Sequence, residues 1–229
     1  MLAKRAYESV RDEVKGTRHK LLKLFWIFLL ASLVGALVEI LFVGVTTGRW
    51  MSRSGLLYGQ FSAIWGLGAV LMTVLLHRLS GKNDRYIFIC GALLGGGYEY
   101  LCSWVGEKVF GVLFWDYSDF VFNLGGRINL LFCLFWGMAA VAWVKVLYPR
   151  MSRLVDRFIN WKHKTFVLVV TVLMVANIVV SLAALWRYGE RQAGDAPDNA
   201  VERFLDEHYD DEFMEHRYQN MRLPEDSGS

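Results

Sequence analysis

Long apolar runs separated by short polar stretches dominate the chain up to residue 186. The runs cover residues 24–45, 61–79, 86–109, 128–148 and 166–186. Each is about long enough to cross roughly 30 Å of hydrocarbon as a helix. Backbone amides in lipid must bond within their own segment, so spans of this kind are helices. The pattern predicts an all-α polytopic membrane bundle of about five transmembrane helices.

Two stretches of the chain resemble each other and predict an internal two-helix repeat, over about 24–79 and 86–148. Each copy has a glycine four residues before a glutamate and, further on, a Trp-Gly pair: Gly35, Glu39 and Trp65-Gly66 in the first, Gly95, Glu99 and Trp136-Gly137 in the second. Many transport folds place a site between such repeats, near the middle of the bilayer. The two glutamates are therefore the first candidates for a functional role.

The distribution of charge predicts the orientation of the chain. Lys and Arg residues gather in 1–23, 78–85 and 145–164, whereas only four lie in the two opposite loops. Positively charged loops stay on the cytoplasmic side, so we expect a cytoplasmic N-terminus and, after five crossings, an extracytoplasmic C-terminus. The predicted domains are a basic cytoplasmic segment (1–23), the five-helix transmembrane domain (24–186) and a separate acidic tail (187–229).

Composition agrees with a membrane protein and excludes other classes. The 229 residues are 55% hydrophobic and 15% aromatic, and nothing in the basic segment indicates nucleic-acid binding. Cys90, Cys102 and Cys133 all fall inside predicted spans, without the spacing of a metal site. We interpret them as packing thiols.

The buried carboxylates need compensating partners. A charged side chain at the centre of a membrane helix costs about 2.5–3.5 kcal/mol on insertion scales. Glu39 and Glu99 should lie at similar depth, with Arg127 as the nearest cation and Arg53 as its rough equivalent in the first repeat. Either these groups bind a solute or exchange a proton in a polar cavity, or the glutamates only bond to loop groups and fix how the hairpins pack.

The two outer loops, residues 46–60 and 106–127, supply the other candidates for a binding site. Aromatic groups beside short polar groups and glycines can converge on a small ligand. The alternative is an aromatic belt at the membrane interface with ordinary turn residues. The substrate-binding candidates are Glu39, Glu99, Arg127, Asp116, Asn123, Trp115, Tyr58 and Gln60.

Known catalytic motifs do not occur in the sequence. It has no nucleophile elbow, no His-Glu-x-x-His motif and no phosphate-binding glycine loop ending in Lys-Ser or Lys-Thr. The acidic stretch 206–212 lacks the glycine and the spacing of a calcium loop. No catalytic residue, metal or cofactor is predicted, and ATP hydrolysis would need a separate protein.

Motifs in the outer loops and the following spans carry a family resemblance, over roughly residues 30–145. They are Tyr58-Gly59 with Trp65-Gly66, Trp115-Asp116-Tyr117-Ser118, and Asn123 through Arg127-Ile128 into Trp136-Gly137. These stretches resemble bacterial membrane proteins of the putative ABC-transporter type IV family. The resemblance implies a multi-pass protein of the bacterial inner membrane, permease-like and without its own ATPase, but it brings no substrate.

Three classes of function remain open. The leading hypothesis is a permease that moves a small polar or charged solute through a site between the repeats. Its partners would be membrane lipids and an ATP-binding subunit or a second copy of the chain. The alternatives are a membrane-embedded enzyme acting on a lipid head group, with the glutamates as acid and base and Arg127 holding phosphate, and a scaffold that recruits partners through its acidic tail.

Overall fold

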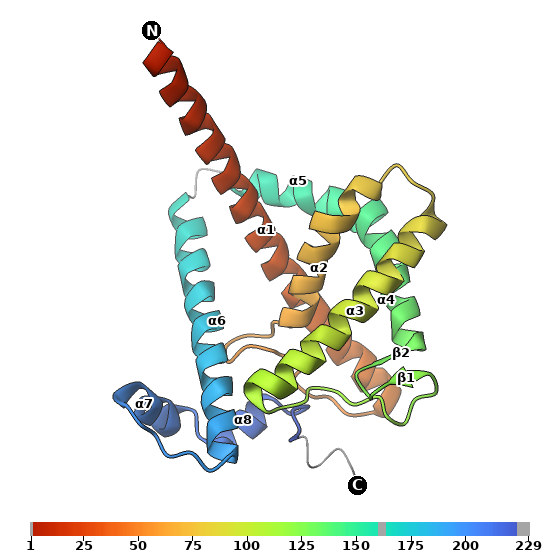
Figure 1. The fold of residues 1–229 in the computed structure, drawn as a ribbon, viewed down its shortest axis with the longest axis vertical. Coiled ribbons are helices and arrows are strands. Elements are labelled where there is room, and N and C mark those ends of the chain that lie inside the picture. The colour runs from red at the N-terminus through yellow and green to blue at the C-terminus, as the bar shows by residue number, and fades with distance from the viewer. Residues whose placement is uncertain (1, 160–163, 224–229) are drawn as a thin grey trace.

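The computed structural model describes the backbone of residues 2–159 and 164–223, and the side chains of residues 16–159 and 165–223. Most of the predicted basic segment, Lys162 and Lys164, and the end of the predicted tail from residue 224 therefore lie outside the described side chains. Within the described residues, the regular secondary structure is helical apart from one small hairpin, and irregular loops join the helices, which confirms the all-α prediction (Figure 1). The elements are α1 (Leu2–Thr47), α2 (Ala63–Leu76), η1 (His77–Leu79), α3 (Asp84–Phe110), β1 (Asn123–Leu124), β2 (Ile128–Asn129), α4 (Leu130–Ala142), η2 (Trp143–Leu147), α5 (Tyr148–Ile159), α6 (Lys164–Gln192), α7 (Ala200–His208) and α8 (Asp211–Arg217).

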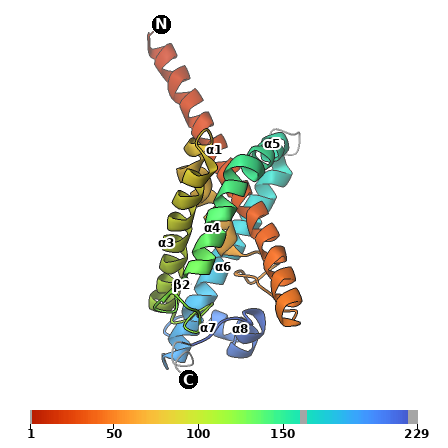
Figure 2. The same ribbon diagram turned by 90° about the vertical axis from the view of Figure 1, so that its right-hand side faces the viewer.

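The helices are arranged as two packed pairs with α6 beside them. The helix α1 packs along α2, and α3 packs along α4. The second pair lies side by side in two perpendicular views (Figures 1 and 2). A hydrophobic core formed mainly by α1, α2, η2 and α5 joins the pairs. Trp143 on η2 donates a hydrogen bond of 3.0 Å from Nε1 to Thr73 Oγ1 on α2, which links the two pairs by a buried polar contact.

The end of α4 turns sharply. The segment η2 is a π-helical turn, a feature that often bends a helix. The following helix α5 lies across the end of the bundle (Figure 1). Asp156 of α5 bonds Lys23 Nζ of α1 at 2.6 Å and His19 at 3.2 Å. The turn and these ion pairs fix α5 against the predicted cytoplasmic end of α1.

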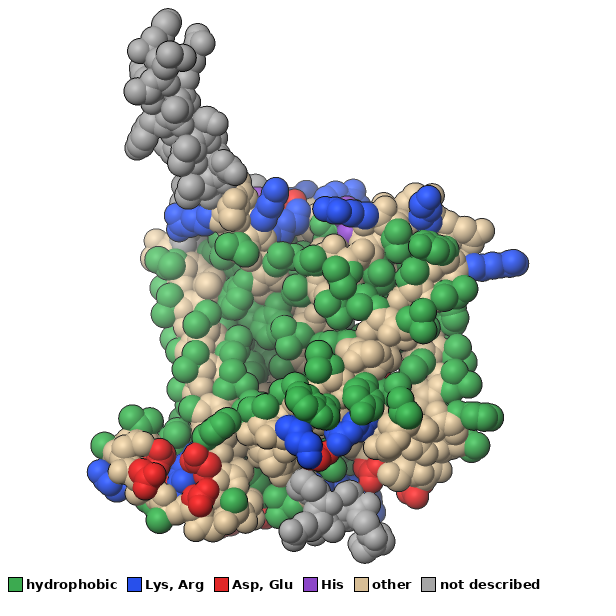
Figure 3. All heavy atoms as spheres, in the orientation of Figure 1, with side chains coloured by type: hydrophobic (Ala, Val, Ile, Leu, Met, Phe, Trp, Pro, Cys, Tyr) green, Lys and Arg blue, Asp and Glu red, His purple; other side chains and the backbone are tan. Residues whose placement is uncertain are grey.

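Three helices are long and apolar enough to cross a membrane, among the residues that the structure describes. They are Gly16–Thr47, Leu130–Ile159 and Thr165–Gln192, and the apolar helix Ala63–Leu79 is shorter. The 27-residue α3 is long enough but carries several charged side chains. In the space-filling view a broad band of hydrophobic side chains lies between an edge rich in Lys and Arg and an opposite end where Asp and Glu gather (Figure 3).

The acidic tail folds back onto the bundle. Its helices α7 and α8 lie at the end opposite α5 (Figures 1 and 2). A second hydrophobic cluster brings Leu205, Met214 and Tyr218 of the tail together with Leu57 and Val112 of the two outer loops. The tail is thus packed against both loops and against α6, and it forms part of the same folded body as the helices.

Candidate functional site

Glu99 is buried between the long outer loop and α4. Its side chain lies on α3 and the residue is 6% exposed. The Tyr117 hydroxyl donates a hydrogen bond of 2.7 Å to Oε1, and Trp136 Nε1 donates one of 3.1 Å to Oε2. Hydrogen bonds to a charged group are stronger than those between neutral groups. Both oxygens of the carboxylate therefore have a donor, one from the long outer loop and one from α4.

Glu39 occupies a similar place in the other helix pair. It lies on α1, and Arg53 Nη2 is 4.0 Å from its Oε1. The side chains of Ser62 and Trp65 also lie close to this carboxylate. Glu39 and Glu99 are near enough to interact electrostatically with each other. The structure therefore brings both predicted glutamates, with Arg53, to one region between the pairs.

The tryptophans beside the glutamates sit in matching positions. A Cβ at Gly35 would lie 2.2 Å from Trp65 Cγ, and a Cβ at Gly95 would lie 2.3 Å from Trp136 Cγ. The rings of Trp65 and Trp136 meet with their centroids 6.2 Å apart. In each pair, the two helices approach each other closely at a glycine, and the two tryptophan rings contact each other between the pairs.

Arg127 lies elsewhere. Its guanidinium pairs with Glu107 and donates a hydrogen bond of 3.3 Å to Ser103 Oγ. It also lies 5.8 Å from the ring centroid of Tyr100. The sequence places Arg127 beside the two predicted glutamates, whereas the structure pairs it with a third glutamate of α3. Arg53 is the arginine within ion-pair distance of Glu39.

Asn123 and Asp116 shape the long outer loop. Asn123 Oδ1 accepts a hydrogen bond of 3.0 Å from the Gly126 backbone amide at the turn between β1 and β2. This turn has φ of +59° at Gly125 and +67° at Gly126, as glycine favours. The Ser118 hydroxyl donates a hydrogen bond of 2.6 Å to Asp116 Oδ1, which holds the pKa of that carboxyl below its usual range. Asn123 organises the loop itself, and Asp116 remains at its surface.

Tyr58 and Gln60 hold the shorter outer loop in place. The Tyr58 hydroxyl shares a hydrogen bond of 2.9 Å with Tyr209 of the tail, and this bond and burial raise the pKa of Tyr209 to about 12. The Asn177 side chain of α6 bonds both backbone groups of Tyr58. Gln60 Oε1 accepts a hydrogen bond of 3.0 Å from Ser52 Oγ. Tyr58 thus joins the loop to α6 and the tail, and Gln60 bonds within the loop.

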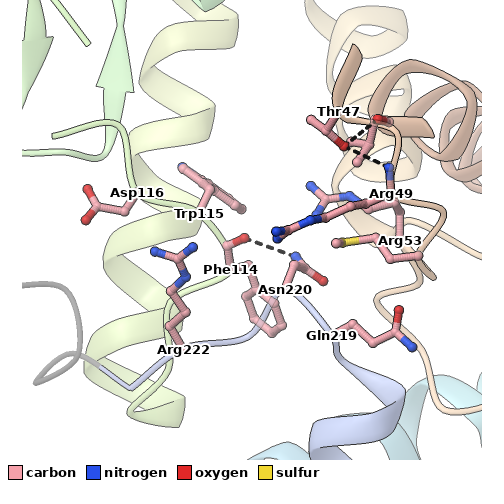
Figure 4. A pocket seen from close by; sticks show the side chains of 11 residues that line it. Thr47, Arg49, Arg53, Phe114, Trp115, Asp116, Gln219, Asn220 and Arg222 are labelled. Carbon is pink, nitrogen blue, oxygen red and sulfur yellow. Dashed lines mark hydrogen bonds between the residues drawn. The ribbon is translucent and has the colours of Figure 1, made fainter. Parts of the chain in front are cut away.

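A cavity of about 550 Å³ opens beside Glu39's partner Arg53. Its walls come from residues 43–53, from residues 114–116 and from residues 219–222 of the tail. Arg49 and Arg53 point across it toward the wall that carries Trp115 and Arg222 (Figure 4). Of the predicted site residues, Trp115 and Asp116 line this cavity.

The sequence gives little sign of the remaining cavity residues. Arg222 lies in a segment predicted to be separate, and Arg49 stands in the sequence as an ordinary loop cation. Tyr117 belongs to a motif noted in the sequence, but nothing there indicates a bond to Glu99. Among the described residues, no group of three or more His, Cys, Asp or Glu side chains could hold a metal ion.

Comparison with known proteins identifies the family. The family described as putative ABC-transporter type IV matches residues 26–182, which include all the long apolar helices except their ends and both predicted glutamates. Neither the curated proteins nor the solved structures give a match. The matched region and the apolar helices make this a membrane protein of a transport-related group. The chain belongs to the putative ABC-transporter type IV family.

Proposed function

We propose that this protein is a permease-like component of the bacterial inner membrane, which moves a small polar or charged solute through a site between two helical repeats. The repeats are the pair α1 and α2 and the pair α3 and α4. Family membership and the apolar helices support a transport role.

The observation that carries the proposal is the pair of glutamates between the helix pairs. Glu99 is 6% exposed, and Glu39 comes close to it from the other pair. An ionisable side chain inside a membrane is costly and usually marks a pathway for solutes or protons. One such carboxylate comes from each helix pair, so a solute that passes between the pairs would meet both.

The proposed topology has five crossings, by α1, α2 with η1, α3, α4 and α6. The matched contacts of Gly35 with Trp65 and of Gly95 with Trp136 support the internal repeat. The N-terminus is cytoplasmic and the tail extracytoplasmic, because Lys and Arg gather at the edge near α5 (Figure 3). Membrane lipids cover the apolar band in this arrangement.

Energy for transport comes from a partner in this proposal. The sequence has no phosphate-binding loop for ATP, and the family is one of ABC transporters. An ATP-binding subunit is therefore the proposed partner. Five helices alone enclose only a small pathway, and a second copy of the chain would complete it.

Uptake by membrane vesicles tests the proposal. Vesicles of both orientations, prepared from the protein's own cells and supplied with ATP, are incubated with a ¹³C-labelled mixture of polar metabolites, and their contents are read by mass spectrometry. We expect at least one labelled compound to accumulate with the wild-type protein and not with Glu99→Gln or Glu39→Gln.

Glu107→Gln is the matched control, because Glu107 lies on the same helix as Glu99 but pairs with Arg127. It should retain uptake. Equal uptake by wild type, Glu99→Gln and vesicles without the protein would overturn the transport proposal. Release of a modified lipid by the purified protein alone would instead favour the enzyme. Loss of function on removal of 190–229, but not in Glu39→Gln or Glu99→Gln, would favour the scaffold.

A further inference from the structure

We infer that the cavity at the outer end of α1 is a binding site for a phosphate monoester group, carried either by a small soluble compound or by a lipid such as phosphatidic acid. The inference deepens the proposed function, on which its role as a substrate site rests. Binding at the cavity does not itself depend on transport.

Three arginines surround the cavity. Arg49 and Arg53 come from the loop after α1, and Arg222 comes from the tail (Figure 4). In the part of the chain that the structure describes, the guanidinium groups of Arg49 and Arg222 form no hydrogen bond and no ion pair within 4 Å. Their donors are therefore available to a ligand that enters between them.

The charge of the lining favours an anion. Its three arginines and Asp116 give a formal charge near plus two, which the pairing of Arg53 with Glu39 reduces. A phosphate monoester carries about −1.5 to −2 at pH 7 and has three strong acceptor oxygens. Guanidinium groups bind such oxygens through paired N–H donors. A phosphate group offers three acceptor oxygens to the three arginines, whereas a monocarboxylate offers two, so phosphate is the better fit.

Apolar side chains also line the cavity, on both of its sides. They are Val43 and Met51 beside Arg49 and Arg53, and Phe114 and Trp115 opposite them. A volume of about 550 Å³ lies within the usual range for small-molecule sites. Inorganic phosphate would leave these side chains uncovered, whereas an organic monoester would place its apolar part against them and its phosphate among the arginines.

Hydrogen bonds between the tail and the two loops fix the walls of the cavity. Leu113 and Arg222 exchange two backbone hydrogen bonds of 2.8 Å, and Asn220 Nδ2 donates one of 3.0 Å to the Phe114 carbonyl. On the other side, Gln219 Oε1 accepts a hydrogen bond of 3.1 Å from the Ser52 amide. The tail thus spans both loops and presents Arg222 without needing its side chain for attachment.

Titration calorimetry on the full-length protein in phosphatidylcholine nanodiscs tests the site, with phenyl phosphate and inorganic phosphate as probes. We expect phenyl phosphate to bind more tightly than inorganic phosphate. Arg222→Gln should weaken its binding about tenfold, since a hydrogen bond to a charged group contributes roughly that much. Arg49→Gln should act in the same direction.

Arg203→Gln is the matched control. Arg203 lies on the exposed surface of α7 and outside the cavity, so its replacement removes the same charge from the same tail. It should leave the affinity unchanged. An equal loss with Arg203→Gln, or no binding of either a phosphate probe or phosphatidic acid by the wild-type protein, would overturn the site.

A second experiment distinguishes a lipid head group from a soluble compound as the carrier of the phosphate. Nanodiscs containing phosphatidic acid are examined by native mass spectrometry, with and without phenyl phosphate. Retained phosphatidic acid that is lost in Arg222→Gln assigns the site to a lipid head group, and phenyl phosphate binding without lipid retention assigns it to a soluble compound. Binding without any solute uptake by vesicles would overturn the proposed function and leave the site standing.

Discussion

At the scale of single residues, the Tyr117 hydroxyl is the closest partner of Glu99. It lies 2.7 Å from Oε1 and comes from a loop, whereas the second donor, Trp136, comes from a helix. A buried acceptor that loses its donor has neither the hydrogen bond nor water to replace it, which lowers the stability of the fold. The loop is thus coupled to the carboxylate by one short bond.

We expect Tyr117→Phe to lower the free energy of unfolding by about 1–3 kcal/mol, because it leaves one oxygen of the buried Glu99 side chain without its donor. Thermal unfolding in detergent measures the change. Tyr86→Phe is the control, since Tyr86 is 52% exposed and its hydroxyl has no hydrogen bond among the described residues. If the two variants unfold alike, the bond to Glu99 does not stabilise the fold.

At the scale of elements, the helix pairs depend on glycine at the crossing points. Gly95 and Gly97 are two residues apart on α3 and differ in their surroundings. A Cβ at Gly95 would lie 2.3 Å from Trp136 Cβ and Cγ, whereas a Cβ at Gly97 would have no atom within 4 Å. The first two side-chain atoms of a tryptophan cannot move away without a shift of the helix.

Gly95→Ala should therefore destabilise the protein by about 1–3 kcal/mol, as overpacking does. Gly97→Ala should be neutral or stabilising, because alanine favours helix more than glycine. The melting temperatures of both variants in the same detergent provide the measurement. A Gly95→Ala variant as stable as Gly97→Ala would show that α3 and α4 are not closely packed at this point.

The apolar pattern predicts the helices well and the connections poorly. The predicted span 86–109 agrees with α3 to within two residues at each end, because charged residues and Gly111 bound it. The predicted span 128–148 instead runs through the π-helical turn η2 into α5. The start of the bend is not marked, because Ala142, Trp143 and Val144 are all apolar, whereas Lys145 in the turn and the charged residues of α5 mark only the end of the run.

At the scale of the whole molecule, the tail is fastened to α6 by an ion-pair network. Arg187 is 2% exposed, and its Nε and Nη2 bond the two oxygens of Asp206 at 2.9 and 3.0 Å. Arg191 adds bonds of 2.7 Å to Asp206 and to Asp211. Removing one member of a buried pair leaves a charge without a partner, which is strongly destabilising.

Acid should release the tail. The hydrogen bond from Arg187 holds the pKa of Asp206 below its usual value. The pairing therefore stabilises the docked tail above the unfolded pKa, and this contribution is lost as the pH falls through the lower folded pKa, below about pH 4. Hydrogen exchange of residues 200–217 should rise over that range.

Asp206→Asn provides the same test at neutral pH, because it removes the charge without acid. We expect faster exchange in 200–217 at pH 7, whereas the exposed substitution Glu207→Gln should leave exchange unchanged. Slow exchange in Asp206→Asn would mean that the remaining contacts of the tail hold it without this ion pair.

The residues of the candidate site could be predicted from the sequence only in part. Glu39 and Glu99 stand out in the sequence because a carboxylate is rare in an apolar run, and Arg53 follows from its place in the repeat. Arg222 does not stand out, because the contacts that bring it to the cavity join residues over a hundred positions apart, such as Asn220 with Phe114. Polar pairing over that distance leaves no periodic trace in the sequence.

Residues 219–222 are the last part of the cavity wall to leave the ribosome. A chain that stalls or is clipped after α6 keeps every long apolar helix and both glutamates, yet it lacks Arg222 and one side of the cavity. Quality control that senses only helix packing would accept such a chain. On the proposed topology, the cavity forms only after residues 219–222 have been translocated, so ligand binding there would report that this part of the tail has reached its place.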